Sequence, residues 1–272
     1  MLGFESTSKK LLAAILGLAV GWPIPAVVAQ EAFRDDFLQL DTERWYISDG
    51  WSNGDWQACT WSSDMVSVED GMLRLTLAPS DNAAAAAPAG VKTPYLCGEI
   101  QTNDIFHYGT YEARIRTDAA SGVNSAFFTY IGPVHEQSHN EIDVEILTRN
   151  TRRVEFNTYR DGAPAYGTAV PIPDGSTTDS EFHTYAFIWE KEQLRWYVDG
   201  VLVHEATGSN LPELAQKIYL SQWNTLTLTD WMGEFVDPGR PLVMEIDWVA
   251  YTPLGADCQV EGSILCEDGV SD

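Results

Sequence analysis

Basic residues are scarce in this chain. Its 272 residues include 16 lysines and arginines against 40 aspartates and glutamates, a formal net charge of −24 at pH 7. Such a surface repels polyanions rather than attracting them. The charge balance therefore excludes typical nucleic-acid-binding proteins and proteins that hold anionic membranes through basic patches.

The apolar run at the amino terminus is too short for a membrane span, which takes about 20 residues. It covers residues 11–20, follows Lys9 and Lys10, and ends near Gly21 and Pro23. Small residues at 26–29 offer a cleavage site, so residues 1–29 fit a secretory signal peptide better than a membrane anchor. We expect a secreted protein, extracellular or periplasmic, with no membrane partner after cleavage.

Cysteine is also rare, with four residues in the chain. In an oxidising compartment an even number suggests disulfides, and four cysteines permit three connectivities. We favour Cys59–Cys97 within the domain and Cys258–Cys266 in the tail. No pair has the short spacing of a zinc knuckle, so a zinc site is not expected.

After residue 29 the sequence contains no long stretch with the period of a helix. Apolar and polar residues alternate instead with the period of a β-strand. Strands are expected at residues 73–77, 111–116, 154–159 and 242–251, and as two strands around Asp199-Gly200 within residues 184–204. This pattern predicts an all-β protein, a two-sheet antiparallel sandwich. We place its single domain at residues 30–253 and an acidic tail at 254–272.

The sequence His-Asn-Glu-Ile-Asp-Val-Glu-Ile at residues 139–146 is the central motif. Alternate side chains of a strand point to opposite faces, so Glu141, Asp143 and Glu145 share one face. Three like charges on one face destabilise a sheet. The motif is therefore a solvated outer face, a calcium site or a paired-carboxylate catalytic site.

A hairpin turn at residues 148–152 would bring a return strand beside this motif. The resulting register pairs Glu141 with Tyr159, Asp143 with Asn157 and Glu145 with Glu155. Glycoside hydrolysis needs two carboxyl groups, one of which donates a proton. Repulsion from Asp143, to which Glu155 would add, would raise the pKa of Glu145, as a general acid requires.

Aromatic residues gather in two turn-rich segments, residues 51–61 and 223–231. Core packing is the ordinary explanation for any single ring. Two clusters in turns favour a carbohydrate groove instead, because ligand sites are lined by aromatic side chains that can stack on sugar faces.

The run Glu141-Ile142-Asp143-Val144-Glu145 resembles the signature of glycoside hydrolase family 16. The resemblance covers residues 33–253, and its further landmarks are residues 50–54, 59–61, 97–99, 127–130 and 196–200. Their order resembles the bacterial lichenase type, which cleaves mixed-linkage β-glucan. Residues 124–132 and 227–233 resemble the succinoglycan-depolymerising glycanases more closely.

The resemblance implies a concanavalin-like jelly roll whose concave sheet forms the substrate cleft. It implies that Glu141 is the nucleophile, Asp143 its assistant and Glu145 the acid/base of a retaining, endo-acting β-glycanase that needs no cofactor for catalysis. It supports the Cys59–Cys97 pairing. The implied substrate-binding residues are Asn53, Glu99, Phe128, Tyr130, His139, Asn157, Tyr159, Trp223 and Trp231.

Several positions depart from the lichenase pattern. His139 stands where those enzymes carry Trp, Gln101 replaces an Arg and Ser221 replaces an Asn. These changes favour a substrate other than plain cereal glucan, such as a bacterial exopolysaccharide. We expect a β-glucan or acidic exopolysaccharide substrate, no nucleic-acid partner and a monomer.

A structural calcium ion is a further implication of the resemblance, away from the cleft. Asp247 matches the carboxylate position and Gly71 one carbonyl donor, and oxygen ligands suit calcium. Without the resemblance, Asp247 reads as an ordinary solvated or hydrogen-bonded strand residue.

Two other functions share this scaffold. A non-catalytic carbohydrate-binding module would explain the aromatic clusters but gives no reason to hold three repelling acids together. A transglycosylase would use the same residues and transfer the glycosyl group to a sugar instead of water.

Overall fold

The structure is a computed structural model that describes residues 30–80 and 93–266. The predicted signal peptide, residues 1–29, therefore lies outside the described residues. Within these two ranges, no helix is long and apolar enough to span a membrane.

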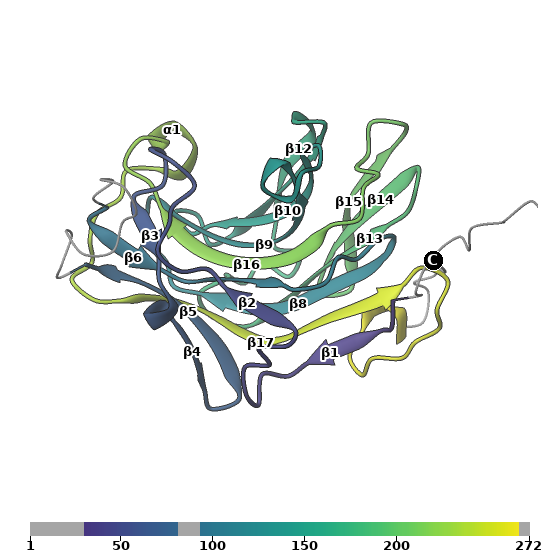
Figure 1. Cartoon of the computed structure of the whole chain (residues 1–272), viewed down its shortest axis with the longest axis horizontal. Helices are drawn as coiled ribbons and strands as arrows, with labels where there is room; N and C mark the ends of the chain where they lie inside the picture. Colours follow the sequence, from purple (N-terminus) through teal and green to yellow (C-terminus); the bar gives the residue numbers. More distant parts are fainter. Residues whose placement is uncertain (1–29, 81–92, 267–272) are drawn as a thin grey trace, which may run out of the picture.

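Two β-sheets make up most of the fold (Figure 1). The larger has ten strands in the order β15-β14-β13-β8-β17-β5-β6-β3, with β1 beside β17 and β4 beside β5. These strands are β1 Phe33–Asp35, β3 Cys59–Trp61, β4 Val66–Glu69, β5 Met72–Pro79, β6 Tyr95–Cys97, β8 Gly109–Thr117, β13 His183–Trp189, β14 Gln193–Val198, β15 Val201–Thr207 and β17 Leu242–Pro253.

The second sheet has seven strands in the order β12-β11-β10-β9-β16-β7-β2. These are β2 Trp45–Ile47, β7 Glu99–Thr102, β9 Val123–Ile131, β10 Asn140–Leu147, β11 Arg153–Arg160, β12 Ala163–Pro171 and β16 Lys217–Asn224. The short helices are η1 Ser63–Met65, η3 Pro133–His135, α1 Thr229–Met232 and η4 Ile264–Cys266. In Figure 1 the second sheet is curved, and α1 and β12 stand on either side of its hollow face.

The predicted two-sheet antiparallel sandwich is confirmed. Its strands are antiparallel except where β3 pairs with β6. The predicted hairpin at Asp199-Gly200 is present between β14 and β15, and both residues have the positive φ that a tight hairpin turn needs. The prediction of a single strand before this hairpin is wrong, because a turn at residues 190–192 divides the segment into β13 and β14.

The apolar faces of the two sheets pack against each other. Ile142, Val144 and Ile146 of β10 are fully buried and share a core cluster with Phe187 and Trp189 of β13. Burial of one such side chain stabilises the fold by about 1.5–3 kcal/mol. A slip of β10 by one residue would expose all three, so the core fixes the acidic side chains on the hollow face.

Both predicted disulfides are present. Cys59–Cys97 joins β3 to β6, and Cys258–Cys266 closes a short loop in the tail. The tail packs on the outer face of the larger sheet, where Val260 contacts Trp248 and Ala250. Further along, Ile264 packs on Ala186, Ile188 and Tyr197 of β13 and β14.

Candidate active site

A cleft of about 1410 Å³ lies on the hollow face of the second sheet. Its floor comes from β7, β9, β10, β11 and β16, and its walls include residues of the two aromatic segments. The cleft brings together every predicted catalytic and substrate-binding residue: Asn53, Glu99, Phe128, Tyr130, His139, Glu141, Asp143, Glu145, Asn157, Tyr159, Trp223 and Trp231.

The register of β10 against β11 matches the prediction. Glu141 lies opposite Tyr159, Asp143 opposite Asn157 and Glu145 opposite Glu155. The three acids of β10 and their three partners line the same cleft. The alternation of polar and apolar residues and the position of one turn were therefore sufficient to predict this part of the site.

The pKa of Glu145 is raised to about 8. Burial is the main cause of this rise; a hydrogen bond opposes it, and the charges of Glu141 and Glu155 add to it. That bond comes from Asn124 Nδ2, which donates to Glu145 Oε1 over 2.9 Å. A carboxyl that keeps its proton at neutral pH can act as a general acid.

Asp143, between the two glutamates, is 4 % exposed. Burial raises its pKa well above its ordinary range, and the charges of Glu141 and Glu145 add to the effect. Asp143 also forms a side-chain hydrogen bond with Glu141. A protonated Asp143 can donate this hydrogen bond and so stabilise a charged Glu141.

Glu141 has a second partner in His139. The imidazole Nε2 lies 2.5 Å from Glu141 Oε2. The imidazole ring stacks on Tyr159, with ring centres 4.8 Å apart, and meets Tyr130 edge-on. The ring of His139 is thus packed against two tyrosines and aimed at one oxygen of Glu141.

Aromatic rings build the walls of the cleft. Trp56 meets Trp223 edge-on at 4.8 Å, and Trp223 lies 6.2 Å from Trp231. Trp231 Nε1 donates to Glu155 Oε2 over 3.0 Å, which ties the wall to β11. On the floor, Phe128 stacks on Tyr219 at 4.9 Å. Such rings can stack on the C–H faces of sugars.

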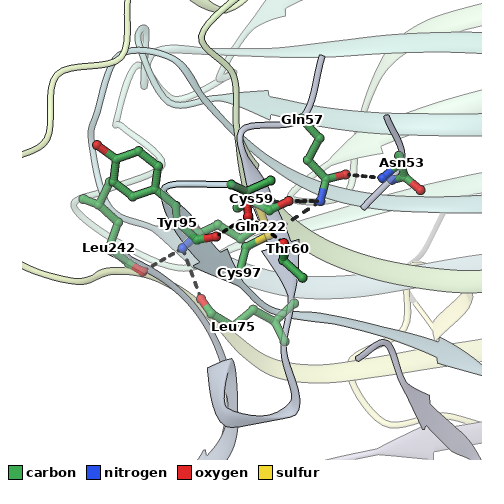
Figure 2. The surroundings of a disulfide bond; sticks show 10 residues. Asn53, Gln57, Cys59, Thr60, Leu75, Tyr95, Cys97, Gln222 and Leu242 are labelled. Carbon is green, nitrogen blue, oxygen red and sulfur yellow. Dashed lines mark hydrogen bonds between the residues drawn. A yellow bond between two sulfur atoms is a disulfide. The ribbon is translucent and has the colours of Figure 1, made fainter. Parts of the chain in front are cut away.

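The Cys59–Cys97 disulfide supports the loop that carries Asn53. Figure 2 shows Gln57 between them: its Nε2 donates to Cys59 O over 3.0 Å, and Asn53 N donates to its Oε1 over 3.2 Å. The amide of Ala58 also donates to Asn224 O at the end of β16. The cross-link and these bonds fix the loop against the floor.

Glu99 is a fourth buried carboxyl of the cleft. It is 3 % exposed, accepts a hydrogen bond from Ser48 Oγ over 2.6 Å, and has a pKa raised by burial to about 8. Nearby, Tyr219 donates to Gln101 Oε1 and contacts His135. The predicted binding residue Glu99 is therefore an uncharged hydrogen-bonding group at neutral pH.

Some lining residues were not found from the sequence. Asn124 reaches the cleft because β9 pairs with β10, and Tyr219 because β16 pairs with β9. His135 lies on η3, in the connection between β9 and β10. No spacing in the sequence relates Asn124 to Glu145, which are 21 residues apart. Knowledge of the strand order would have been needed to find them.

Asp247 and Gly71 lie away from the cleft. Asp247 is on β17, and its Oδ2 lies 2.5 Å from Arg114 Nη1. Gly71 has a φ of +73° in the turn between β4 and β5. Among the residues that the structure describes, no cluster of three or more His, Cys, Asp or Glu could hold a metal ion.

The sequence and structure are similar to known glycosidases. The family described as glycosyl hydrolases family 16 matches residues 53–250. The chain is 46 % identical to the endo-1,3-1,4-beta-glycanase ExoK of Rhizobium meliloti over 239 residues, covering 87 % of this chain and 84 % of that protein. It is 36 % identical to a beta-glucanase of Paenibacillus polymyxa, covering 82 % and 89 %. The solved structure of Bacillus licheniformis beta-glucanase superposes with a TM-score of 0.74 at 34 % identity, covering 82 % and 98 %.

Proposed function

Because this chain belongs to the glycosyl hydrolases of family 16, we propose that it is an endo-acting β-glycanase that cleaves β-1,3-1,4-linked glucan or a closely related exopolysaccharide. The observation that carries the proposal is the placement of Glu141 and the buried Glu145, whose pKa is raised, on the same strand face inside an aromatic-walled cleft. Both kinds of carboxyl group that glycoside hydrolysis needs are thus in place.

The proposed reaction has two displacements. Glu141 attacks the anomeric carbon while Glu145 gives its proton to the leaving glycosidic oxygen, which forms a covalent glycosyl-enzyme and a neutral sugar. Glu145, now a carboxylate, takes a proton from water as the water attacks the anomeric carbon and releases Glu141. Each displacement inverts the carbon, so the product retains the β-configuration.

Asp143 and His139 act on Glu141 in this proposal. Both contact its carboxylate, and His139 holds Oε2. Two hydrogen-bond partners fix the rotation of the carboxylate that is to attack. The other predicted cleft residues bind the glycan by stacking and hydrogen bonding.

The cleft favours an uncharged stretch of glycan. Its lining includes five carboxyl groups and, among the described residues, no lysine or arginine. An anionic sugar in the cleft would face like charges whenever these groups ionise. We propose that the main chain bound there is neutral, as it is in a β-glucan.

The residues at Asp247 do not fit the implied calcium site. A calcium ion there would have to displace the guanidinium of Arg114, which already neutralises the carboxylate. No step of the proposed reaction uses a metal or cofactor.

Digestion of lichenan, laminarin, xyloglucan and succinoglycan, followed by reducing-end assay, tests the activity. We expect lichenan or succinoglycan to be cleaved internally, and proton NMR at early times to show the β-anomer first. Glu141→Gln should abolish cleavage, whereas Glu136→Gln, an exposed control, should not. If wild-type protein cleaves none of the four, the proposal is wrong.

Transglycosylation would use the same groups. Mass spectrometry with an added acceptor sugar distinguishes it, because a hydrolase yields products that do not incorporate the acceptor. A non-catalytic module is disfavoured by the protonated Glu145 beside Glu141, since binding alone needs no proton donor.

Secretion through residues 1–29 and a monomeric state stay predictions. Amino-terminal sequencing of protein from the culture medium or periplasm should begin at Gln30. Light scattering should give the mass of one chain. A mature protein that retains residues 1–29, or a stable dimer, would contradict them.

A further inference from the structure

Three arginines differ from the other arginines of this protein. Arg149, Arg152 and Arg153 lie in or directly after the turn between β10 and β11, and none has a carboxylate of the described residues within 4.0 Å. Every other arginine pairs with such a carboxylate. In a chain this acidic, an arginine without a carboxylate partner is unusual, and these three occupy one short segment.

Two of these arginines line a side pocket of about 280 Å³. Its lining residues are Leu147, Arg149, Asn150, Arg153 and Glu155. Glu155 also lines the main cleft, so the pocket adjoins the cleft at β11. Because Glu155 is the cross-strand partner of Glu145, the pocket lies next to the proposed proton donor.

Each of the two guanidinium groups that line the pocket contacts a backbone carbonyl. Arg153 Nη2 donates to Ala169 O on β12 over 2.7 Å, and Arg149 Nη1 lies 3.5 Å from Asp230 O on α1. A guanidinium has five N–H donors, so most remain free to bind a ligand. Arg152 is directed elsewhere, because its Nη1 donates to Gly175 O and it does not line the pocket.

The charge of the pocket is opposite to that of the cleft. Two guanidinium groups outweigh the single carboxylate of Glu155, which already accepts a hydrogen bond from Trp231. The cleft itself offers an acidic group no basic partner. The planar fork of arginine suits a carboxylate, which it can bind through two parallel hydrogen bonds.

We propose that this side pocket binds a carboxylate carried by the glycan, while the neutral main chain lies in the cleft. The inference rests on the proposed glycanase activity and deepens it: the enzyme acts best on an acidic polysaccharide. The carboxylate can belong to a uronic acid residue or to a pendant acidic substituent, since both present the same group to Arg149 and Arg153.

The test compares lichenan with two acidic derivatives. Partial oxidation of its primary hydroxyls gives uronic acid residues, and carboxymethylation gives pendant acids. We expect the Arg149→Gln/Arg153→Gln variant to lose about three- to tenfold in kcat/KM on at least one derivative, as for one or two partly exposed charge pairs. On lichenan itself it should stay within about twofold of wild type. The derivative with the larger loss identifies the source of the carboxylate.

Two controls separate charge from structure. Arg152→Gln removes an arginine from the same turn but not from the pocket, and should leave kcat/KM unchanged on all three substrates. Arg149→Lys/Arg153→Lys keeps the charge and should recover part of the loss. Added salt should reduce the difference in kcat/KM between wild type and Arg149→Gln/Arg153→Gln on the acidic derivative, because salt screens exposed charges.

Equal losses on lichenan and both derivatives would show that the arginines support the fold only, and no loss on either derivative would show that they do not meet the substrate. Either result overturns the inference while leaving the glycanase activity intact. If wild-type protein releases no reducing ends from any of the three glucans or from succinoglycan, the proposed function itself fails.

Discussion

Carboxyl groups on the two sheets differ in whether they have basic partners. On the outer face of the larger sheet, Glu245 lies 2.5 Å from Arg116 and Asp247 lies 2.5 Å from Arg114. In the cleft, no carboxyl group of a lining residue lies within 4.0 Å of a described lysine or arginine. The paired acids link neighbouring strands, whereas burial without a basic partner raises the pKa of Glu99, Asp143 and Glu145 in the cleft.

The largest effect should come from replacing Glu145 in the cleft, compared with replacing an acid on the outer face of the larger sheet. Glu145→Gln should lower kcat/KM on a glucan by about 10²–10⁴-fold, because proton transfer to the leaving oxygen is lost. The matched control Glu245→Gln removes a paired acid of the outer sheet and should leave kcat/KM within about twofold, at a cost of about 1 kcal/mol in unfolding free energy. Steady-state kinetics and denaturant unfolding check both. Similar losses of kcat/KM in the two variants would show that the acids of the cleft and of the outer face do not differ in function.

His139→Gln should have the next largest effect. The shorter amide loses the stacking on Tyr159 and holds Glu141 less firmly. We expect kcat to fall about tenfold or more with a smaller change in KM, as when a group that positions a nucleophile is disturbed. A variant whose KM rises with kcat unchanged would show that His139 binds sugar and does not position Glu141.

Glu155→Gln should move a pH profile without removing activity. The charge of Glu155 raises the pKa of Glu145, so the amide should lower that pKa. Glu145 must be protonated for the first displacement, and the alkaline limb of kcat/KM should therefore shift to lower pH. Glutamine can still accept the hydrogen bond from Trp231. The control Trp231→Phe loses the bond but keeps the charge, and its alkaline limb should stay in place.

Glu99→Gln should stabilise the protein at alkaline pH. The pKa of Glu99 is raised to about 8 in the folded state. Between the pKa of the unfolded chain and this value, Glu99 keeps its proton in the folded protein but loses it on unfolding. Stability is then full below the unfolded pKa and falls as pH rises towards 8. The amide removes this loss. Its Tm should equal that of wild type below about pH 4 and exceed it at pH 8, by about 2–4 °C for each kcal/mol relieved.

The smallest effect should follow metal removal. Arg114 already neutralises Asp247, so EDTA should shift Tm by less than about 1 °C. Calorimetry with and without added calcium measures the shift. A rise of several degrees with calcium would show that the ion displaces Arg114 and binds Asp247 after all.

The strand that carries Glu141, Asp143 and Glu145 could be predicted from the sequence, because the residues that define it are close together in the chain. The alternation in residues 140–147 fixes which side chains share a face, and one turn fixes the register with β11. The strand at residues 242–251 followed from the same alternation and is β17. The division of residues 184–204 was missed because the turn at 190–192 contains no glycine, proline, asparagine or aspartate.

The electrostatics of the site could not be predicted in the same way. Asn124 meets Glu145 only because β9 pairs with β10, and Arg114 meets Asp247 only because β8 pairs with β17. Both contacts depend on which strands become neighbours, a choice made by packing of the whole core. The residue type at position 247 therefore did not reveal the contact of Asp247 with Arg114.

The tail beyond the family match has a practical consequence for protein engineering. The family match ends at residue 250, yet Val260 and Ile264 cover Trp248, Ala250, Ala186 and Ile188 on the outer sheet. An enzyme shortened after β17 would expose both groups of apolar side chains to water, where they would favour aggregation. Fusion partners and affinity tags therefore belong after the Cys258–Cys266 loop, and a minimal version of the enzyme must keep that loop.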